Sequence, residues 1–599
     1  MLVLRSLSML VLLSGLCSAQ GTERVSIGTN AVQSSLFNDS AVFGRSISAD
    51  GRFIVFWSNS SNLVGNDNNG VPDVFVRDRL SGITELVSVS STGAQGDGVS
   101  GAEVVTLSAN GEVVAFTSDA TNLVAGDTNG CSDVYVHDRG SGLTELISIG
   151  YLGAQSDFPS ATAVVASDGR HVAFASAATN LVPGDSNWAW DCFLHDRQSG
   201  VTARVSLANN GLEGNGASGY PVLSRDGRFV GFSSDATNLV QGDTNGSLDG
   251  FVRDLSTGTT LRVSVDSSGS EASGPSSIQA LSAHGRYVLF ASAASNLVAG
   301  DTNGVVDAFL HDMLSGTTER VGLSASGAQP NADCWPRVMS EDGRYILLES
   351  AATNLTAGDT NGVSDVFLRD RVTGTTERVS VAADGSQANG ASRNGSLTND
   401  GRYLLFSSDA SNLVPGDTNN FGDVFLRDRF ATGFTSLCDP GANGVSACPC
   451  ANPPAGTGRG CDNSASTGGA ALTAGGIAYL SLDSLVFHTS GERPNATSVL
   501  LQGDSLLANG AVFGQGVRCA GGALKRMYVK AALGGGIVAP DLSAGDATIS
   551  MRSALLGAPI QAGQPHFFLV YYRDPLVLGG CPATSTFNCT QTGSVVYWP

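Results

Sequence analysis

Lysine is almost missing from this sequence: Lys525 and Lys530 are the only two among 599 residues, and the formal net charge is −21. An acidic surface repels phosphate backbones, so nucleic-acid binding is not expected. The surplus of acidic groups favours the attraction of cations, or simply solubility. Beyond residue 19 no stretch is long and apolar enough to cross a membrane, so a transmembrane segment is not expected either.

Catalytic signatures are lacking as well. The chain has only seven histidines, and it contains no G-x-S-x-G, no H-E-x-x-H and no glycine-rich phosphate loop. No spacing of acidic residues singles out a catalytic pair. The sequence therefore favours a protein that is not an enzyme, and it assigns no catalytic residue.

Glycine, in contrast, is abundant at 76 residues, as a turn-rich all-β chain requires. Much of it belongs to a repeat whose opening aspartate recurs after 60 residues and then every 58: Asp67, Asp127, Asp185, Asp243, Asp301, Asp359 and Asp417. A near-constant period of this length indicates a repeat architecture.

Each repeat combines short strand signals with tight turns. In the sixth repeat, a variable first strand ends in the turn at 340–343, and further strands are expected at 345–348, 366–369 and 376–380. Asp-Gly pairs are typical of such turns, because glycine takes a positive φ without steric cost. Four short strands without a helical period predict one blade of a β-propeller, and seven repeats predict seven blades.

A ring of blades closes only where the last blade meets the first. Residues 22–27 (TERVSI) copy the fourth strand of the sixth repeat at 376–381 (TERVSV), whereas residues 434–437 (FTSL), which follow the seventh repeat, match it poorly. We therefore predict that the N-terminal segment supplies the missing strand of the seventh blade.

The flanking regions differ in composition from the repeats. Residues 1–19, with one arginine, an apolar run and small residues near their end, are typical of a secretory signal. The propeller is expected over 20–437, a Cys/Pro/Gly-rich connector over 438–461, and a small β-sandwich over 462–599. Strands of this sandwich are expected at 477–482, 498–501, 527–529, 547–551, 567–572 and 595–598. The chain is thus expected to be secreted or extracytoplasmic.

Ten of the eleven cysteines follow the signal, and an even count in a secreted chain favours disulfides. Cys581 and Cys589 flank a short loop and are a candidate pair. Cys131 and Cys192 occupy equivalent loops of adjacent repeats and are another. A zinc site is the alternative for the connector cysteines, Cys438, Cys448, Cys450 and Cys461.

The D-x-N-G-x-x-D loop of several repeats is a candidate calcium site. It offers carboxylate and amide oxygens at alternating positions, with a glycine for the bend, which suits Ca²⁺. It resembles the calcium loop of integrin-like FG-GAP propellers, without the central Asp-Gly pair of that motif. The alternative is that these side chains only cap a turn. The candidate ligands are Asp127, Asn129, Asp133, Asp243, Asn245, Asp249, Asp301, Asn303, Asp307, Asp359, Asn361 and Asp365.

A basic residue followed by aspartate closes the third strand of every repeat, and the basic residue is His137, His195 or His311 in three of them. Equivalent positions on different blades are spread around the ring, so these residues do not converge on one site. We interpret the pair as scaffold, with the aspartate capping the next turn and the basic group paired locally.

Residues that determine ligand specificity are expected where the repeats differ, because the scaffold does not fix those positions. The most variable part of the repeats is the first strand, which lines the central channel of a propeller. Its mixed aromatic, basic and acidic side chains could grip a sugar, a peptide or a carboxylate at one mouth of the channel, or they could simply fill it. The candidate ligand-binding residues are Arg45, Glu103, Tyr220, Gln279, Trp335, Arg337 and Arg393.

Two resemblances extend this interpretation. The motifs S-x-D-G-R-[FY] and D-V-F-[VL]-R-D resemble the TolB-type, WD-like β-propeller repeat, which implies extracytoplasmic binding of a protein or other ligand. The C-terminal part is similar to a module of secreted proteins of planctomycete-like bacteria, on the motifs GCDNS (460–464), FGQGVRCAGG (513–522) and YYRDP (571–575). That likeness implies a location outside the cytoplasm rather than an activity.

Together these features predict a secreted, non-catalytic propeller that recognises a protein or glycan partner at the cell exterior. Two alternatives remain open at this point. One is a carbohydrate-active hydrolase or lyase with its site at the channel mouth, and the other is a calcium-stabilised surface adhesin.

Overall fold

The computed structural model describes residues 21–597 except 30–31, 35–41, 43, 102–103, 383–384, 420, 430–433, 443, 476–477, 479–482, 484, 562–563 and 579–585. The expected signal segment lies outside these residues. The chain divides into two compact units, residues 21–429 and the C-terminal residues that follow. None of the described helices is long and apolar enough to span a membrane.

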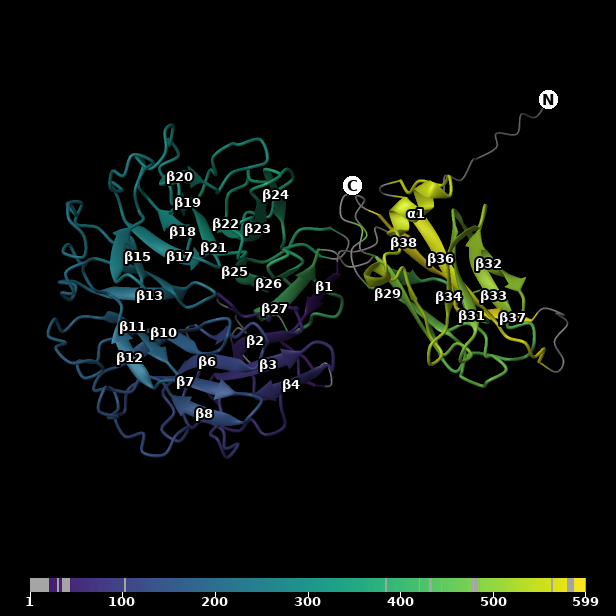
Figure 1. Cartoon of the computed structure of the whole chain (residues 1–599), viewed down its shortest axis with the longest axis horizontal. Coiled ribbons are helices and arrows are strands. Elements are labelled where there is room, and N and C mark those ends of the chain that lie inside the picture. Colours follow the sequence, from purple (N-terminus) through teal and green to yellow (C-terminus); the bar gives the residue numbers. More distant parts are fainter. Residues whose placement is uncertain are drawn as a thin grey trace, which may run out of the picture. The chain divides into compact units, whose positions relative to one another are not determined.

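The described residues of the first unit form seven small antiparallel sheets around a common centre, as predicted for a β-propeller (Figure 1). Blade 1 contains β2 (Phe53–Ser58), β3 (Asp73–Asp78) and β4 (Ile83–Leu86). Blade 2 contains β5 (Thr106–Leu107), β6 (Val113–Ser118), β7 (Asp133–Asp138) and β8 (Leu143–Leu146). Blade 3 contains β9 (Ser160–Val165), β10 (His171–Ser176), β11 (Asp191–Asp196) and β12 (Val201–Arg204).

The remaining blades repeat the same order from the inner strand outward. Blade 4 contains β13 (Ser218–Leu223), β14 (Phe229–Ser234), β15 (Asp249–Asp254) and β16 (Thr259–Arg262). Blade 5 contains β17 (Ser276–Leu281), β18 (Tyr287–Ser292), β19 (Asp307–Asp312) and β20 (Thr317–Arg320). Blade 6 contains β21 (Cys334–Met339), β22 (Tyr345–Ser350), β23 (Asp365–Asp370) and β24 (Thr375–Arg378).

Blade 7 joins the two ends of the ring. Its inner strands are β25 (Ser392–Leu397), β26 (Tyr403–Ser408) and β27 (Asp423–Asp428), and its fourth is β1 (Gly21–Arg24), which pairs antiparallel with β27. The predicted N-terminal closing strand is therefore confirmed. An ion pair between Arg79 of blade 1 and Glu23 of β1, at 2.6 Å, then links the first blade to the last.

The hydrophobic core of the propeller lies between neighbouring blades. One cluster joins Val55 and Val76 of blade 1 to Val105, Leu107 and Phe116 of blade 2. The second strand of a blade is buried along nearly its whole length because both faces of the sheet are covered by neighbours. No blade could bury these faces alone, so the ring is the unit of stability.

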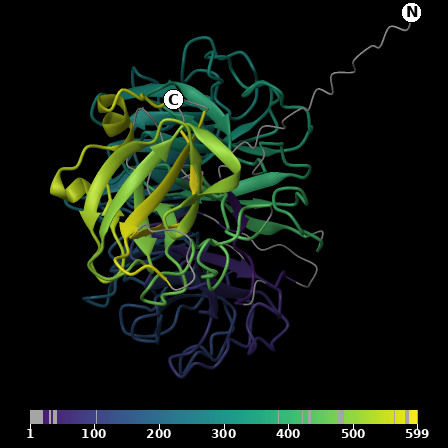
Figure 2. The ribbon, with the colours of Figure 1, turned by 90° about the vertical axis from the view of Figure 1, so that its right-hand side faces the viewer.

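The second unit is a β-sandwich (Figure 1, Figure 2). Its main sheet contains β28 (Thr435–Ser436), β38 (Gly593–Val596), β36 (Pro565–Arg573), β31 (Thr497–Gly503), β34 (Lys525–Ala531) and β37 (Phe587–Cys589). A second sheet contains β29 (Ala471–Gly475), β30 (Val486–Ser490) and β35 (Val538–Ala539). The hairpin of β32 (Ser505–Phe513) and β33 (Gly516–Gly521) packs on the other face of the main sheet.

Of the strands predicted in this unit, 477–482 lies almost entirely outside the described residues, and 547–551 is wrong. Residues 547–551 do not form a strand but the start of a helix, α1 (Ile549–Leu555), which follows the 3₁₀ turn η1 (Leu542–Ala544). Thr548 caps α1 by accepting a hydrogen bond from the Met551 N–H, and Ile549 and Ser553 on one face are buried. The cap and the spacing of four residues between the buried positions outweigh the strand preference of the segment.

Two cysteine predictions are also wrong, since Cys131, Cys192 and Cys589 are free thiols, and Cys581 lies outside the described residues. The observed bridges are Cys438–Cys519 and Cys448–Cys461, and Cys450 is disulfide-bonded as well. Sulfurs in disulfides are not available as thiolate ligands, so the connector cysteines do not form the alternative zinc site.

Candidate functional site

In five blades, both aspartates of the D-x-N-G-x-x-D loop lie beside the guanidinium of one arginine. In blade 5 the guanidinium of Arg320 lies 2.9 Å from an Asp301 oxygen and 3.4 Å from an Asp307 oxygen, and all three side chains are buried. The amide nitrogen of Asn303 donates to Asp307, at 3.1 Å, and to the Pro330 carbonyl. Here the guanidinium supplies the positive charge that a calcium ion would bring.

The same arrangement recurs in four other blades, each with an arginine from the fourth strand between two loop aspartates. The sets are Asp185–Arg204–Asp191, Asp243–Arg262–Asp249, Asp359–Arg378–Asp365 and, with an arginine from β1, Asp417–Arg24–Asp423. In the sets that contain Asn245 and Asn361, the asparagine again donates to the second aspartate. These contacts join the loop to the outer strand of its own blade.

Blades 1 and 2 lack this arginine, because Leu86 and Leu146 stand in its place. In blade 1 the amide nitrogen of Gln95 donates to both Asp67 and Asp73, at 2.8 Å each. Burial is the largest cause that shifts the pKa of Asp73 and raises it to about 6. The hydrogen bonds that this carboxylate accepts lower the pKa and only partly offset the effect of burial.

In blade 2, Gln155 and the Tyr135 hydroxyl both donate to Asp127, and Asn129 donates to Asp133. Within the described part of the chain one acidic group, Asp243, Asp249 and Glu271, has ligand atoms close enough together for a metal ion. Arg262 contacts all three of them, at 3.6, 3.5 and 2.7 Å.

The basic residue that closes the third strand is structural, as predicted. The imidazoles of His137, His195 and His311 each lie 2.9 Å from a threonine hydroxyl of the adjacent fourth strand. The neighbouring aspartate caps the following turn, and in blade 1 Asp78 also pairs with Arg52 through two bonds of 2.9 and 2.7 Å. These contacts are local and do not converge on a site.

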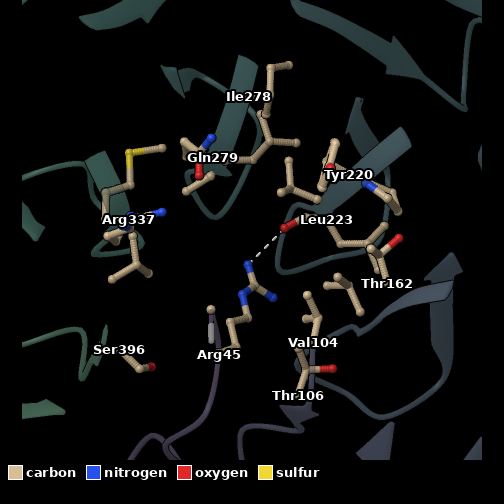
Figure 3. Close-up of a pocket in the computed structure, with 18 of the residues that line it drawn as sticks. Arg45, Val104, Thr106, Thr162, Tyr220, Leu223, Ile278, Gln279, Arg337 and Ser396 are labelled. Carbon is tan, nitrogen blue, oxygen red and sulfur yellow. Dashed lines mark hydrogen bonds between the residues drawn. The ribbon is translucent and has the colours of Figure 1, made fainter. Parts of the chain in front are cut away.

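The central channel holds a cavity of about 970 Å³, lined by the inner strands of blades 2 to 7 and, in blade 1, by residues between 44 and 49 that form no named strand. This volume matches that of ligand sites in proteins, and the wall combines apolar residues with many polar ones, among them Arg45, Gln279 and Arg337 (Figure 3). The channel is therefore open rather than filled by its own side chains.

In blades 3 to 7 a β-bulge in the inner strand places one variable residue on the wall of this cavity. The pairing with the second strand shifts by one residue at Thr162, Tyr220, Gln279, Arg337 and Asn394, in blades 3 to 7. Thr162, Tyr220 and Asn394 have positive φ angles of 53°, 52° and 58°, which are uncommon for residues with a side chain. Bulges of this kind reorient side chains next to functional sites.

The structure brings four of the predicted ligand-binding residues together on the channel wall: Arg45, Tyr220, Gln279 and Arg337. Glu103 lies outside the described residues. Trp335 and Arg393 belong to inner strands but do not line the cavity, and Arg393 pairs with Asp409 at 2.7 Å. Side chains alternate along a strand, so neighbours of the bulged residue point elsewhere.

Several lining residues were not predicted. Thr162 and Asn394 are ordinary polar residues whose position depends on the bulge, which leaves no sequence signal. Trp190 lines the cavity from the loop before β11, two residues after Trp188, which is 76% exposed and has a φ of 56°. The signal for this loop is Trp188 itself, which replaces the glycine found here in most repeats.

Arg45 reaches into the cavity from blade 1. Its Nη2 donates to the carbonyl oxygen of Leu223 in blade 4, at 2.8 Å (Figure 3). Burial is the main cause that lowers the pKa of Arg45, and Glu341 opposes it. Two other arginines of this region have acidic partners: Arg337 lies 2.9 Å from Glu349, and Arg225 lies 2.5 Å from Glu341 at the mouth where the inner strands end.

No family model and no curated protein matches the sequence. Among solved structures, the chain is similar to a TolB-like protein of Agrobacterium tumefaciens, with 18% identity over 52% of this chain and 87% of that one, at a TM-score of 0.29. It is also similar to a prolyl endopeptidase, with 11% identity over 76% of this chain and a TM-score of 0.40, and it spans 55% of that protein's length. The assignment as a propeller rests on the seven sheets of the chain itself.

Proposed function

We propose that this protein is an extracytoplasmic binding protein whose ligand, part of a protein or glycan partner, enters the central channel of the propeller. The observation that carries the proposal is the cavity of about 970 Å³, to whose wall the bulged residues of blades 3 to 7 contribute. A scaffold that repeats one blade pattern and varies the side chains around one cavity is suited to recognition.

The hydrolase alternative requires two carboxyl groups that flank a bond. Among the described lining residues the carboxylates are Asp235 and Glu341. Asp235 follows β14 beside the start of an inner strand, whereas Glu341 follows the end of one, so on the order of 15–20 Å of strand separates them. Glu341 is also held by Arg225. This arrangement favours binding over hydrolysis.

The second unit is proposed to attach or assemble the protein at the cell exterior. Its bridges Cys438–Cys519 and Cys448–Cys461 suit an oxidising compartment, which supports a location outside the cytoplasm. The D-x-N-G-x-x-D loops are proposed to be turns held by arginine or glutamine, because these side chains already bond the candidate calcium ligands.

A screen of immobilised peptides and glycans tests the channel as the binding site. Gln279→Trp places a bulky ring in the cavity, so a ligand bound by the wild-type protein should be lost from this variant. Leu80→Trp is the matched control, because it adds the same side chain on an outer turn where Leu80 is 79% exposed. Undiminished binding by Gln279→Trp would place the site elsewhere.

A further inference from the structure

The exposed aromatic side chains of the protein belong to one short part of the chain. Among the described residues they are Tyr151, Phe158, Trp188, Trp190 and Tyr220, so all five fall within residues 151–220. Trp188 is 76% exposed and Tyr220 is 67% exposed. Single exposed apolar residues are common, but a group of large ones marks a surface that binds a partner.

Four of these side chains lead from a loop of blade 3 to the central channel. The rings of Phe158 and Trp188 contact each other, with centroids 6.4 Å apart and planes at 82°. Trp190 lines the cavity, and its carbonyl oxygen accepts a hydrogen bond from the Ser218 N–H, at 2.7 Å. Tyr220 lies two residues after Ser218 and lines the cavity as well. We call Phe158, Trp188, Trp190 and Tyr220 the aromatic track.

The local backbone does not favour these residues. Trp188 and Tyr220 have positive φ angles, which bulky residues rarely adopt. At the position of Trp188, five other repeats have a glycine with positive φ: Gly70, Gly130, Gly246, Gly304 and Gly362. At the position of Phe158, four repeats have a glycine: Gly98, Gly216, Gly274 and Gly390. An exposed ring adds little to the core, so its presence in place of glycine is better explained by binding than by folding.

The surroundings of the aromatic track disfavour a protein interface and an acidic ligand. The segments 157–160, 185–191 and 215–220 contain no exposed Leu, Ile, Val or Met, so polar groups separate the rings and no continuous apolar face forms. The two arginines of the inner strands, Arg337 and Arg393, lie 2.9 and 2.7 Å from Glu349 and Asp409. Neither is therefore left free to bind an anion.

An unoccupied acceptor lies at the same mouth of the channel. Asp235 is exposed and lines the cavity, and its carboxylate takes part in no hydrogen bond or ion pair of the described residues. It can accept hydrogen bonds from hydroxyl groups, and it repels anions. Asp157 and Asp185 are already bonded, to Thr179 and Arg204. The mouth thus lacks the several free carboxylates that would attract a basic peptide.

We infer that the aromatic track and the channel mouth bind a neutral polysaccharide. The C–H groups on the face of a pyranose ring pack on an aromatic ring, whose π face is negative, while the hydroxyl groups at its edge need hydrogen-bond partners such as Asp235. A polymer repeats both features in every unit, so it suits several rings in succession. This inference rests on the proposed function and selects the glycan as the partner.

The test is calorimetric titration of the full chain with three neutral sugars: cellohexaose, xylohexaose and mannohexaose. At least one should bind the wild-type protein, and Trp188→Gly should weaken that binding by about tenfold or more. Glycine suits the φ of 56° at this position, so Trp188→Gly should keep its melting temperature. Leu314→Ala is the control: it removes an exposed apolar side chain from a turn of blade 5 and should leave the affinity unchanged.

Each other outcome overturns the inference in a distinguishable way. Failure of all three sugars to bind, or equal affinity of Trp188→Gly, would show that the aromatic track does not hold a neutral glycan. Tighter binding of trigalacturonate or of tetralysine would assign the mouth to acidic glycans or to basic peptides. If the screen yields a ligand that Gln279→Trp excludes and no neutral sugar binds, the inference fails and the proposed function stands. If Gln279→Trp excludes no ligand, the proposed function fails and the inference fails with it, because both place the ligand in the channel.

Discussion

At the level of single residues, the main feature of the propeller is the way in which the charge of buried aspartates is balanced. The loops carry two such carboxylates per repeat, and five blades place an arginine between them. The arginine comes from the fourth strand, about 20 residues further along the chain or, for Arg24, from the opposite end of it. The sequence of the loop alone therefore predicts a calcium site. The arginine that balances the charge could not be recognised, because it is distant in the sequence.

Removing one of these arginines should be costly. Arg320→Met leaves Asp301 and Asp307 buried without a cation, which should destabilise the fold by about 3 kcal/mol. Thermal unfolding should show a melting temperature several degrees lower. Arg286→Met, which breaks the exposed pair with Asp312, is the control and should have a much smaller effect.

The same experiment tests the calcium alternative. Adding millimolar Ca²⁺ or EDTA should leave the melting temperature of the wild-type protein unchanged, because Arg320 and its equivalents in five blades, and Gln95 and Gln155 in the other two, already bond the loop carboxylates. A ligand that binds only the native state must raise the melting temperature. A rise of several degrees with Ca²⁺ would show that the loops bind metal after all.

The buried loop aspartates should make stability depend on pH, and Asp73 of blade 1 is one of three whose pKa burial raises to about 6, with Asp185 and Asp307. Burial raises the pKa of Asp73 to about 6, above the unfolded value, so the folded state binds this proton more tightly. The resulting stability is present at low pH and is lost as the pH rises from about 4 through 6. The melting temperature should therefore fall as the pH rises from about 4 to about 6, and by less in Asp73→Asn. An equal fall in both proteins would contradict the assignment to Asp73.

At the scale of elements, the periodic sequence predicts most of the propeller. The turns, the second and third strands and the closing strand β1 are repeated almost letter for letter, so their places follow from one repeat. The bulges could not be predicted, because the residues at these positions are of different types and none of them is characteristic of a bulge. Helix α1 was missed because its cap at Thr548 and its buried face can be recognised only once the sheet it covers is known.

The role of the closing strand β1 can be tested by removing it from the chain and adding it back as a peptide. A chain that begins at residue 28 loses the pairing of β1 with β27 and leaves Asp417 and Asp423 without Arg24, so it should melt at a lower temperature and less cooperatively. Adding a peptide of residues 21–27 should restore the melting temperature in a concentration-dependent manner. The same peptide with Arg24→Met should restore much less. Unchanged melting without the strand would show that the ring does not depend on it.

At the scale of the whole molecule, seven nearly identical blades support one cavity whose wall differs from blade to blade. The variable first strand pointed to this wall from the sequence, and Arg45, Tyr220, Gln279 and Arg337 do lie on it. Trp335 and Arg393 were included because the sequence does not show which way a side chain beside a bulge points. The bond from Arg45 to Leu223 joins distant repeats and was beyond sequence reasoning.

Binding of a ligand in the channel requires that the channel is open in the folded protein. The most direct measurement is the reaction of Gln279→Cys with N-ethylmaleimide, followed residue by residue by mass spectrometry, with buried Cys192 and Cys334 as unreactive internal standards. We expect this cysteine to react in the folded protein and to be protected by the ligand found in the screen. A cysteine as unreactive as Cys192, or one that reacts equally fast at saturating ligand, would contradict it.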